Sequence, residues 1–109
     1  MEKLTFSTNW NGKLWADCFT TIRLYNPNKY KIGEKFEIWL KKDFMHKAIV
    51  LDVKKLKMSE LNNWICALDT GYNLAETQNV LKTMYKDNEE LKKTGDLTLS
   101  YVLLKKLKG

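Results

Sequence analysis

The sequence has few of the residues from which metal sites, disulfides and flexible linkers are built. Its 109 residues include one histidine, one proline, five glycines and two cysteines. The cysteines, Cys18 and Cys66, are far apart and form no CxxC motif, and with the single His46 they disfavour a zinc site. We expect two free thiols in a reducing cytoplasm, and neither a metal nor an organic cofactor.

Long apolar runs are absent as well. No stretch approaches the roughly 18 consecutive apolar residues that indicate a transmembrane helix. The first six residues, MEKLTF, lack the apolar core of a signal peptide. With 44% hydrophobic residues, the chain is too apolar to be disordered. We therefore expect one cytoplasmic domain over residues 1–109, with no membrane partner.

Charge is distributed unevenly along the chain, whose formal net charge is +6. Residues 1–58 carry twelve basic and six acidic groups, residues 59–96 four and seven, and residues 97–109 three and none. If the two basic ends belong to one sheet, that sheet would attract a polyanion such as RNA. The alternative is that lysine, which supplies all but one of the basic residues, only keeps the surface hydrated.

Alternating apolar and polar residues predict five strands. They are expected at residues 4–6, 18–24, 35–41, 46–53 and 97–104. The fourth segment has apolar residues on both faces, which is typical of a central strand. One face would hold Ile49, Leu51 and Val53, and the other Val50. Asparagine and glycine in residues 9–12 predict a turn.

After residue 58 the apolar period becomes that of a helix. Ser59 is a suitable N-cap for a first helix. Gly71 is suited to the left-handed position that ends it. The stripe that this helix would bury consists of Leu61, Trp64, Ile65 and Leu68.

A second helix is expected after Asn73, because Glu76 lies three residues further on in a variant of the capping box. Its stripe consists of Leu74, Thr77, Val80, Leu81 and Met84. Residues 87–96 are charged, contain a glycine and are expected to form a loop. This order of elements favours an α+β domain, a partly open β-barrel of about five to six strands with two helices packed at one end.

Segments in the same order resemble the ASCH domain family, whose fold is PUA-like. Residues 19–23 (FTTIR) resemble a strand that reads roughly K-T-x-T-I-R in that family, and residues 30–38 (YKIGEKFEI) resemble the segment that follows it. Residues 68–72 (LDTGY) and the helix up to Tyr85 resemble its acidic residue, loop and next helix. The resemblance covers about residues 3–104 and implies a cleft between the T-T-I-R strand and the acidic loop.

The resemblance implies two kinds of function. Members are associated with RNA binding, and one bacterial branch is a small amidohydrolase that removes the acyl group from N4-acetylcytidine. That branch uses a lysine, a threonine and an acidic residue. The threonine corresponds to Thr21 and the acidic residue to Asp69. The lysine position holds Cys18, so Lys13, which follows Gly12, is the candidate replacement.

These three residues have defined roles in the implied amidohydrolase. A threonine hydroxyl becomes a nucleophile when a base takes its proton. Asp69 would be that base if burial raised its pKa, and Lys13 would polarise the amide carbonyl. The alternative is that Thr21 is only a strand residue and Asp69 only a residue near a helix end.

A second group of residues points to nucleic-acid binding. Arg23, the only arginine, offers a guanidinium fork that suits phosphate, and the alternative is a salt bridge to Asp69 or Glu37. Trp15 and Tyr72 are candidates for stacking on bases, although aromatic residues also build cores. Lysines that would contact a phosphate backbone are Lys41, Lys42, Lys54 and Lys55.

Three functions follow from these observations. The first is an RNA- or nucleotide-binding protein with the cleft as its site, favoured by the charge distribution and the resemblance together. The second is a small amidohydrolase acting on N4-acetylcytidine or a similar acylated nucleoside. The third is a structural or regulatory partner protein that has the fold and no site.

Overall fold

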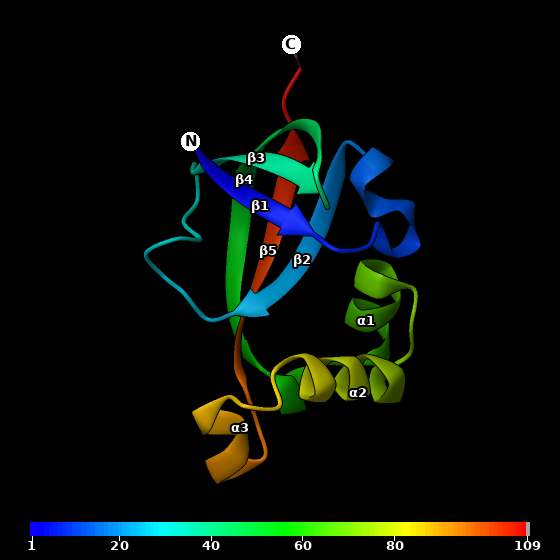
Figure 1. The fold of residues 1–109 in the computed structure, drawn as a ribbon, viewed down its shortest axis with the longest axis vertical. Helices are drawn as coiled ribbons and strands as arrows, with labels where there is room; N and C mark the ends of the chain where they lie inside the picture. Colours follow the sequence, from blue (N-terminus) through cyan, green and yellow to red (C-terminus); the bar gives the residue numbers. More distant parts are fainter. Residues whose placement is uncertain (109) are drawn as a thin grey trace.

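The five predicted strands form one mixed sheet that curls into a half-barrel (Figure 1). The structure, a computed structural model, describes residues 1–108. The order across the sheet is β1 (Glu2–Phe6), β3 (Lys35–Leu40), β4 (Asp43–Lys57), β5 (Thr98–Lys106) and β2 (Cys18–Leu24). β1 pairs with β3 in parallel, and the other neighbours are antiparallel. β1 and β2 are therefore the two edges, and the barrel is open between them.

Three α-helices lie at one end of the long axis (Figure 1). They are α1 (Asn63–Thr70), α2 (Leu74–Met84) and α3 (Glu89–Thr94). Two short 3-10 helices, η1 (Trp10–Trp15) and η2 (Met58–Glu60), follow β1 and β4. The α+β class and the partly open barrel with helices at one end are thus confirmed. No helix within residues 1–108 is long and apolar enough to cross a membrane.

α3 occupies the segment that the sequence predicts as a loop, so that prediction is wrong. Asn88 caps the helix by accepting a hydrogen bond from the backbone N–H of Leu91. Gly95 ends it with a φ of 74°. The helix buries none of its residues, so no apolar period could reveal it, and only its two caps mark it in the sequence.

Two clusters of buried side chains fill the molecule. The first lies inside the half-barrel and includes Leu4 and Phe36. The second lies where the helices meet the sheet and includes Cys66 and Leu81. Residues of β5 belong to both clusters. This strand therefore ties the helical end to the rest of the barrel.

β4 is central, as predicted, but Ile49, Leu51 and Val53 do not share one face, as the alternation predicts they would. Val50 is buried, whereas Ile49 is half-buried and Leu51 is 41% exposed. The register against β5 shifts between Val50 and Asp52, so Leu51 is the extra residue of a β-bulge. A bulge breaks the two-residue alternation of side chains. Strict alternation therefore fails here, and Val53 lies on the same face of β4 as Val50.

The starts of α1 and α2 test the predicted caps. α2 begins after Asn73, and Glu76 completes its capping box as predicted. α1 begins later than predicted because the preceding residues form η2, and its cap is Asn62. The predicted cap, Ser59, instead donates to the carboxylate of Asp96 through both its hydroxyl and its backbone N–H.

α1 also turns an unexpected side toward the sheet. Trp64 and Leu68, which the apolar stripe predicts as buried, are 79% and 67% exposed. The buried residues of α1 are Cys66 and Asp69. The charged partner of Asp69 lies far away in the sequence, at Lys13. A period within the helix cannot reveal that partner.

Candidate functional site

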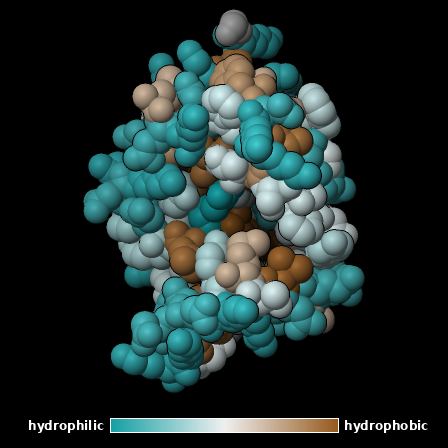
Figure 2. Space-filling model, in the orientation of Figure 1, coloured by the Kyte–Doolittle hydropathy of each residue, from teal (hydrophilic) through white to brown (hydrophobic). Residues whose placement is uncertain are grey.

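A cavity of about 400 Å³ lies on the open side of the half-barrel, bordered by β1, β2, the end of α1 and α2. Figure 2 shows a hollow near the middle of this face, where hydrophilic and hydrophobic side chains meet. Sites for small organic ligands commonly have volumes of about 300–1,000 Å³. We call Lys13, Thr21, Arg23, Lys41 and Asp69 the polar wall of the cavity. Its apolar wall consists of the α2 residues Val80, Leu81 and Met84 with Tyr85, which follows them.

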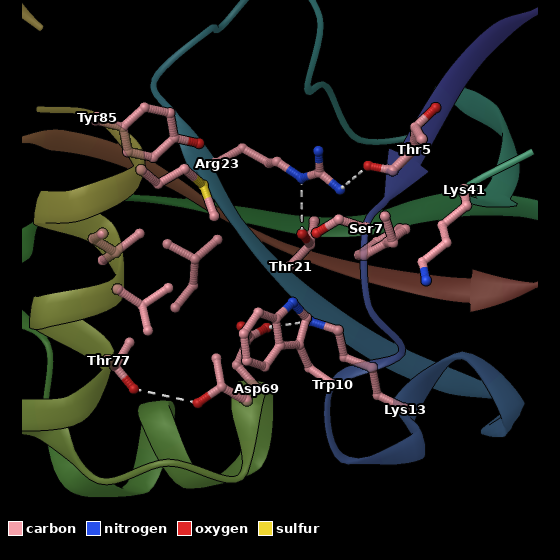
Figure 3. A pocket seen from close by; sticks show the side chains of 16 residues that line it. Thr5, Ser7, Trp10, Lys13, Thr21, Arg23, Lys41, Asp69, Thr77 and Tyr85 are labelled. Atoms are coloured by element: carbon pink, nitrogen blue, oxygen red, sulfur yellow. Dashed lines mark hydrogen bonds and ion pairs between the residues drawn. The ribbon is translucent and has the colours of Figure 1, made fainter. Parts of the chain in front are cut away.

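A buried ion pair forms the centre of the polar wall (Figure 3). The Nζ of Lys13 donates to Oδ1 of Asp69 over 3.0 Å, and the hydroxyl of Thr20 donates to the same oxygen over 2.7 Å. The two charged side chains are only 6% and 4% exposed. Buried charges persist in proteins when they are paired and hydrogen-bonded, as these are.

The chain brings Lys13 to α1 through a tight turn. Asn11 and Gly12 have φ values of 57° and 65°, in the left-handed region that asparagine and glycine tolerate. The Asn11 amide also donates to the carbonyl of Ala67 in α1, over 3.4 Å. A side chain on Gly71, which ends α1, would lie 3.5 Å from Asn11. The predicted turn at residues 9–12 is thus part of the site.

The ion pair presents both a donor and an acceptor to the cavity. Burial lowers the pKa of Lys13, and the neighbouring Asp69 carboxylate opposes part of this change. An ammonium group has three N–H donors, and only one of them is used by Asp69. No donor within residues 1–108 bonds to Oδ2 of Asp69, and this side chain lines the cavity.

Arg23 spans the opening between the two edge strands. From β2 its Nε donates to the hydroxyl oxygen of Thr21, and one terminal nitrogen donates to the carbonyl of Thr5 in β1, each over 3.0 Å. The guanidinium also lies over the Phe6 ring, 4.6 Å from its centre. Within residues 1–108 it forms no salt bridge to Asp69 or Glu37. Its second terminal nitrogen has no protein acceptor among these residues.

The apolar wall follows from the helical period of α2. Leu81 is buried, Val80 and Tyr85 are half-buried, and Met84 is 54% exposed. Burial raises the pKa of the Tyr85 hydroxyl, with the charge of Arg23 acting in the opposite direction. An apolar surface therefore faces the charged polar wall across the cavity.

The structure brings five of the ten predicted site residues together. Thr21, Asp69 and Lys13, the predicted catalytic residues, line the cavity with Arg23 and Lys41. Thr21 is not hydrogen-bonded to Asp69 or Lys13 within residues 1–108, because its hydroxyl oxygen accepts from Arg23.

The other five predicted residues lie outside the cavity lining. Trp15 is 69% exposed on η1. Tyr72 touches Trp10, with ring centres 5.3 Å apart, but does not itself line the cavity. Lys55 lies over the ring of Tyr25. Lys42 and Lys54 are exposed. A lysine track for a long phosphate backbone is thus not part of this cavity.

Sequence reasoning does not select three residues that shape the site. Thr20 binds Asp69, although strand alternation assigns only Thr21 to the cleft. Trp10 lines the cavity at the start of η1, and Tyr85 lines it after α2. The available signals were an aromatic residue inside the asparagine- and glycine-rich turn and a tyrosine at the end of an amphipathic helix.

Within residues 1–108, no three His, Cys, Asp or Glu side chains gather to form a metal site. Comparison of the chain with protein-family models, with curated proteins and with solved structures found no match. The likeness to the ASCH family therefore stays a prediction, and the site must be interpreted from its own chemistry.

Proposed function

We propose that the cavity binds the base of a nucleoside or nucleotide, either free or as one unpaired residue of RNA. The Lys13–Asp69 pair carries this proposal, because it places spare ammonium donors beside a free carboxylate oxygen. Uracil has a carbonyl acceptor beside the N3–H donor, and cytosine, acylated or not, has the N3 acceptor beside the N4–H donor. Such an edge satisfies both sides of the pair, and a site of this kind rejects ligands that leave buried polar groups unpaired.

The apolar wall supports a flat ligand. A base has two apolar faces, and α2 offers Val80 and Leu81 to one of them. Trp10 lies at the rim, where an aromatic side chain can stack on a ring for about 1–3 kcal/mol. One nucleotide unit matches a cavity of this size, whereas the lysines that would follow a longer strand lie outside it.

Calorimetric titration with cytidine, uridine and N4-acetylcytidine tests the proposal. The informative variant is the double substitution Lys13→Met, Asp69→Leu, because replacing both partners of a buried ion pair by apolar residues often preserves stability. We expect wild-type protein to bind at least one nucleoside and the double variant to bind it at least ~10-fold more weakly, through loss of hydrogen bonds to charged groups.

A matched control is available on the surface. Lys57 and Glu90 form an ion pair of the same 3.0 Å length outside the cavity. The variant Lys57→Met, Glu90→Gln should bind like wild type. No binding of any nucleoside by the folded wild-type protein, or equal loss in both variants, contradicts the proposal.

A second candidate function is hydrolysis of an N-acylated nucleoside, and the observation that favours it is that Lys13, Thr21 and Asp69 line one cavity. The Thr21 hydroxyl oxygen would attack the amide carbonyl and lose its proton to a base. The amine would leave with a proton, and water would then release the acid from the threonine ester. The hydroxyl bonded to Asp69 is that of Thr20, however, so Asp69 is not placed to take the proton of Thr21. We therefore prefer binding to hydrolysis.

Chromatographic detection of cytidine released from N4-acetylcytidine tests the second candidate. The variant Thr21→Val keeps the shape of the side chain and removes the nucleophile. We expect turnover by the wild type and none by the variant if the cavity is catalytic. No turnover by the wild type removes hydrolysis and leaves binding as the function, whereas equal turnover in both proteins removes Thr21 as the nucleophile.

A further inference from the structure

One cation of the polar wall has no hydrogen-bond or ion-pair partner among residues 1–108. Lys13 is paired with Asp69, and Arg23 is bonded to Thr21 and Thr5. Lys41 lines the same cavity, yet within residues 1–108 its Nζ forms no hydrogen bond or salt bridge. Three cations thus face one carboxylate in the cavity lining, and the positive charge that remains favours an anionic ligand.

The backbone of Lys41 is held in a conformation that lysine rarely adopts. Lys41 and Lys42 form the two-residue turn between β3 and β4, since Leu40 pairs with Asp43. The φ of Lys41 is 54°, whereas Lys42 has no positive φ. A positive φ at the first turn position alone is the type II′ pattern, in which glycine is the usual residue. A side chain there is strained, and strain of this kind concentrates at ligand sites.

The turn is also fixed in place beside the cavity. The backbone N–H of Lys41 donates to the carbonyl of Phe6 at the end of β1, over 2.8 Å. Figure 3 shows the Lys41 side chain extending from this turn toward the cavity, on the side where Ser7 and Thr5 also lie. The strained backbone thus places the ammonium group of Lys41 at the edge of the ligand space, where the side chain is also exposed to solvent.

We infer that Lys41 binds a phosphate group of the ligand, and that the cavity therefore takes a phosphorylated nucleoside in preference to a free one. This inference rests on the proposed nucleoside site. Lys13 and Asp69 would hold the base, and the unpaired terminal nitrogen of Arg23 adds a second donor for the phosphate. The phosphate is that of a free nucleotide or of an RNA residue.

The turn supplies a matched control for this role. Lys41 and Lys42 are neighbours in the same turn and both are exposed, so Lys41→Gln and Lys42→Gln make the same change of net charge. Only Lys41 lines the cavity. A general attraction between phosphate and a basic surface would respond equally to both substitutions, whereas a specific contact responds to the first alone.

Calorimetry with cytidine and cytidine 5′-monophosphate provides the test. Wild-type protein should bind the monophosphate about tenfold more tightly than cytidine (about 1.4 kcal/mol). Lys41→Gln should abolish this preference, and Lys42→Gln should change it less than about twofold. A preference that survives in Lys41→Gln, or that both variants lose equally, overturns the inference.

The variant Lys41→Gly allows the effect on phosphate binding to be distinguished from an effect on stability. Glycine adopts the turn without strain, so this variant should lose the phosphate preference while its Tm stays equal to or above that of wild type. A lower Tm would overturn the assignment of strain to this position. Binding of cytidine without preference for the monophosphate overturns only the role of Lys41, whereas no binding of the monophosphate or of any of the three nucleosides overturns the proposed function as well.

The source of the phosphate can be determined with the same variants. A cytidine trinucleotide that has only internal phosphodiesters represents RNA, and the monophosphate represents a free nucleotide. A loss of affinity in Lys41→Gln for the trinucleotide assigns the contact to an RNA residue. The same loss for the monophosphate alone assigns it to a free nucleotide.

Discussion

The two walls of the cavity are built in different ways. The apolar wall comes from one helix and the residue after it, whereas the polar wall joins residues of η1, β2, the β3–β4 turn and α1. Apolar contact is not directional, so the period of a single helix is sufficient to form that wall. The polar wall depends on hydrogen bonds between groups far apart in the sequence, such as Lys13 and Asp69. A single substitution in the polar wall should therefore lower the stability of the protein markedly.

The largest expected effect is on the free energy of unfolding, when one partner of the Lys13–Asp69 ion pair is removed and the other is kept. Asp69→Ala leaves Lys13 buried without a partner, which should cost about 3–5 kcal/mol of unfolding free energy. Lys13→Met, Asp69→Leu should recover most of that loss. Urea denaturation at pH 7 measures both variants. A single variant as stable as the double one would contradict the description of this pair as buried and paired.

A slightly smaller effect is expected in the apolar wall, where burial alone should decide the cost. Leu81→Ala removes a buried side chain of the second core cluster and should cost about 2–4 kcal/mol. Met84→Ala, on the same wall but 54% exposed, should cost less than about 1 kcal/mol. If urea denaturation gave equal losses of unfolding free energy for the two variants, the burial of Leu81 and the exposure of Met84 would both be contradicted.

The hydroxyl of Thr20 should matter for stability more than that of Thr21. Thr20→Val removes a 2.7 Å hydrogen bond to the Asp69 carboxylate, and bonds to charged groups contribute about 1.5–3 kcal/mol. Thr21→Val should lower stability less, because within residues 1–108 the Thr21 hydroxyl accepts only from Arg23, which also bonds to Thr5. The reverse order in thermal or urea unfolding would contradict the assignment of Thr20 as the residue that positions Asp69.

The smallest effects concern the pH dependence of stability. Burial lowers the pKa of Lys13 in the polar wall and raises the pKa of Tyr85 in the apolar wall. The pKa of Lys13 is lowered, so its contribution to stability should rise with pH between that lowered value and the ordinary lysine value near 10.4. The pKa of Tyr85 is raised, so its contribution should be full below about pH 10 and be lost above it.

Reference variants isolate each group in these pH measurements. Urea unfolding of wild type against Lys13→Met, Asp69→Leu between pH 8 and 10 should show wild type gaining stability relative to the variant. Against Tyr85→Phe, wild type should lose stability between pH 10 and 11. A slope of the opposite sign in either comparison would contradict the burial of that group.

The comparison of the walls also explains what the sequence could predict. Five strands and the α2 cap follow local patterns and are confirmed, and the apolar stripe of α2 is confirmed except at Met84, which is exposed. Local periods do not predict which side chains are buried where a distant partner or a strand irregularity determines it. Examples are Leu51 in the β4 bulge and Trp64 on the outer face of α1. The ion pair of Lys13 with Asp69 joins residues 56 positions apart. The resemblance suggested these two residues together, but neither their contact nor the role of Thr20 follows from any local pattern.

The four tryptophans offer the most direct test of the central claim, which is that the cavity binds the base of a nucleotide. Trp10 lines the cavity, whereas Trp39 on β3 donates to Glu37 and Trp64 lies on the exposed side of α1. Two-dimensional NMR should therefore show the Trp10 indole N–H signal moving in a saturable way as cytidine 5′-monophosphate is added, while the Trp39 and Trp64 signals stay in place. A Trp10 signal that does not move, or equal movement at Trp39 and Trp64, would contradict nucleotide binding in this cavity.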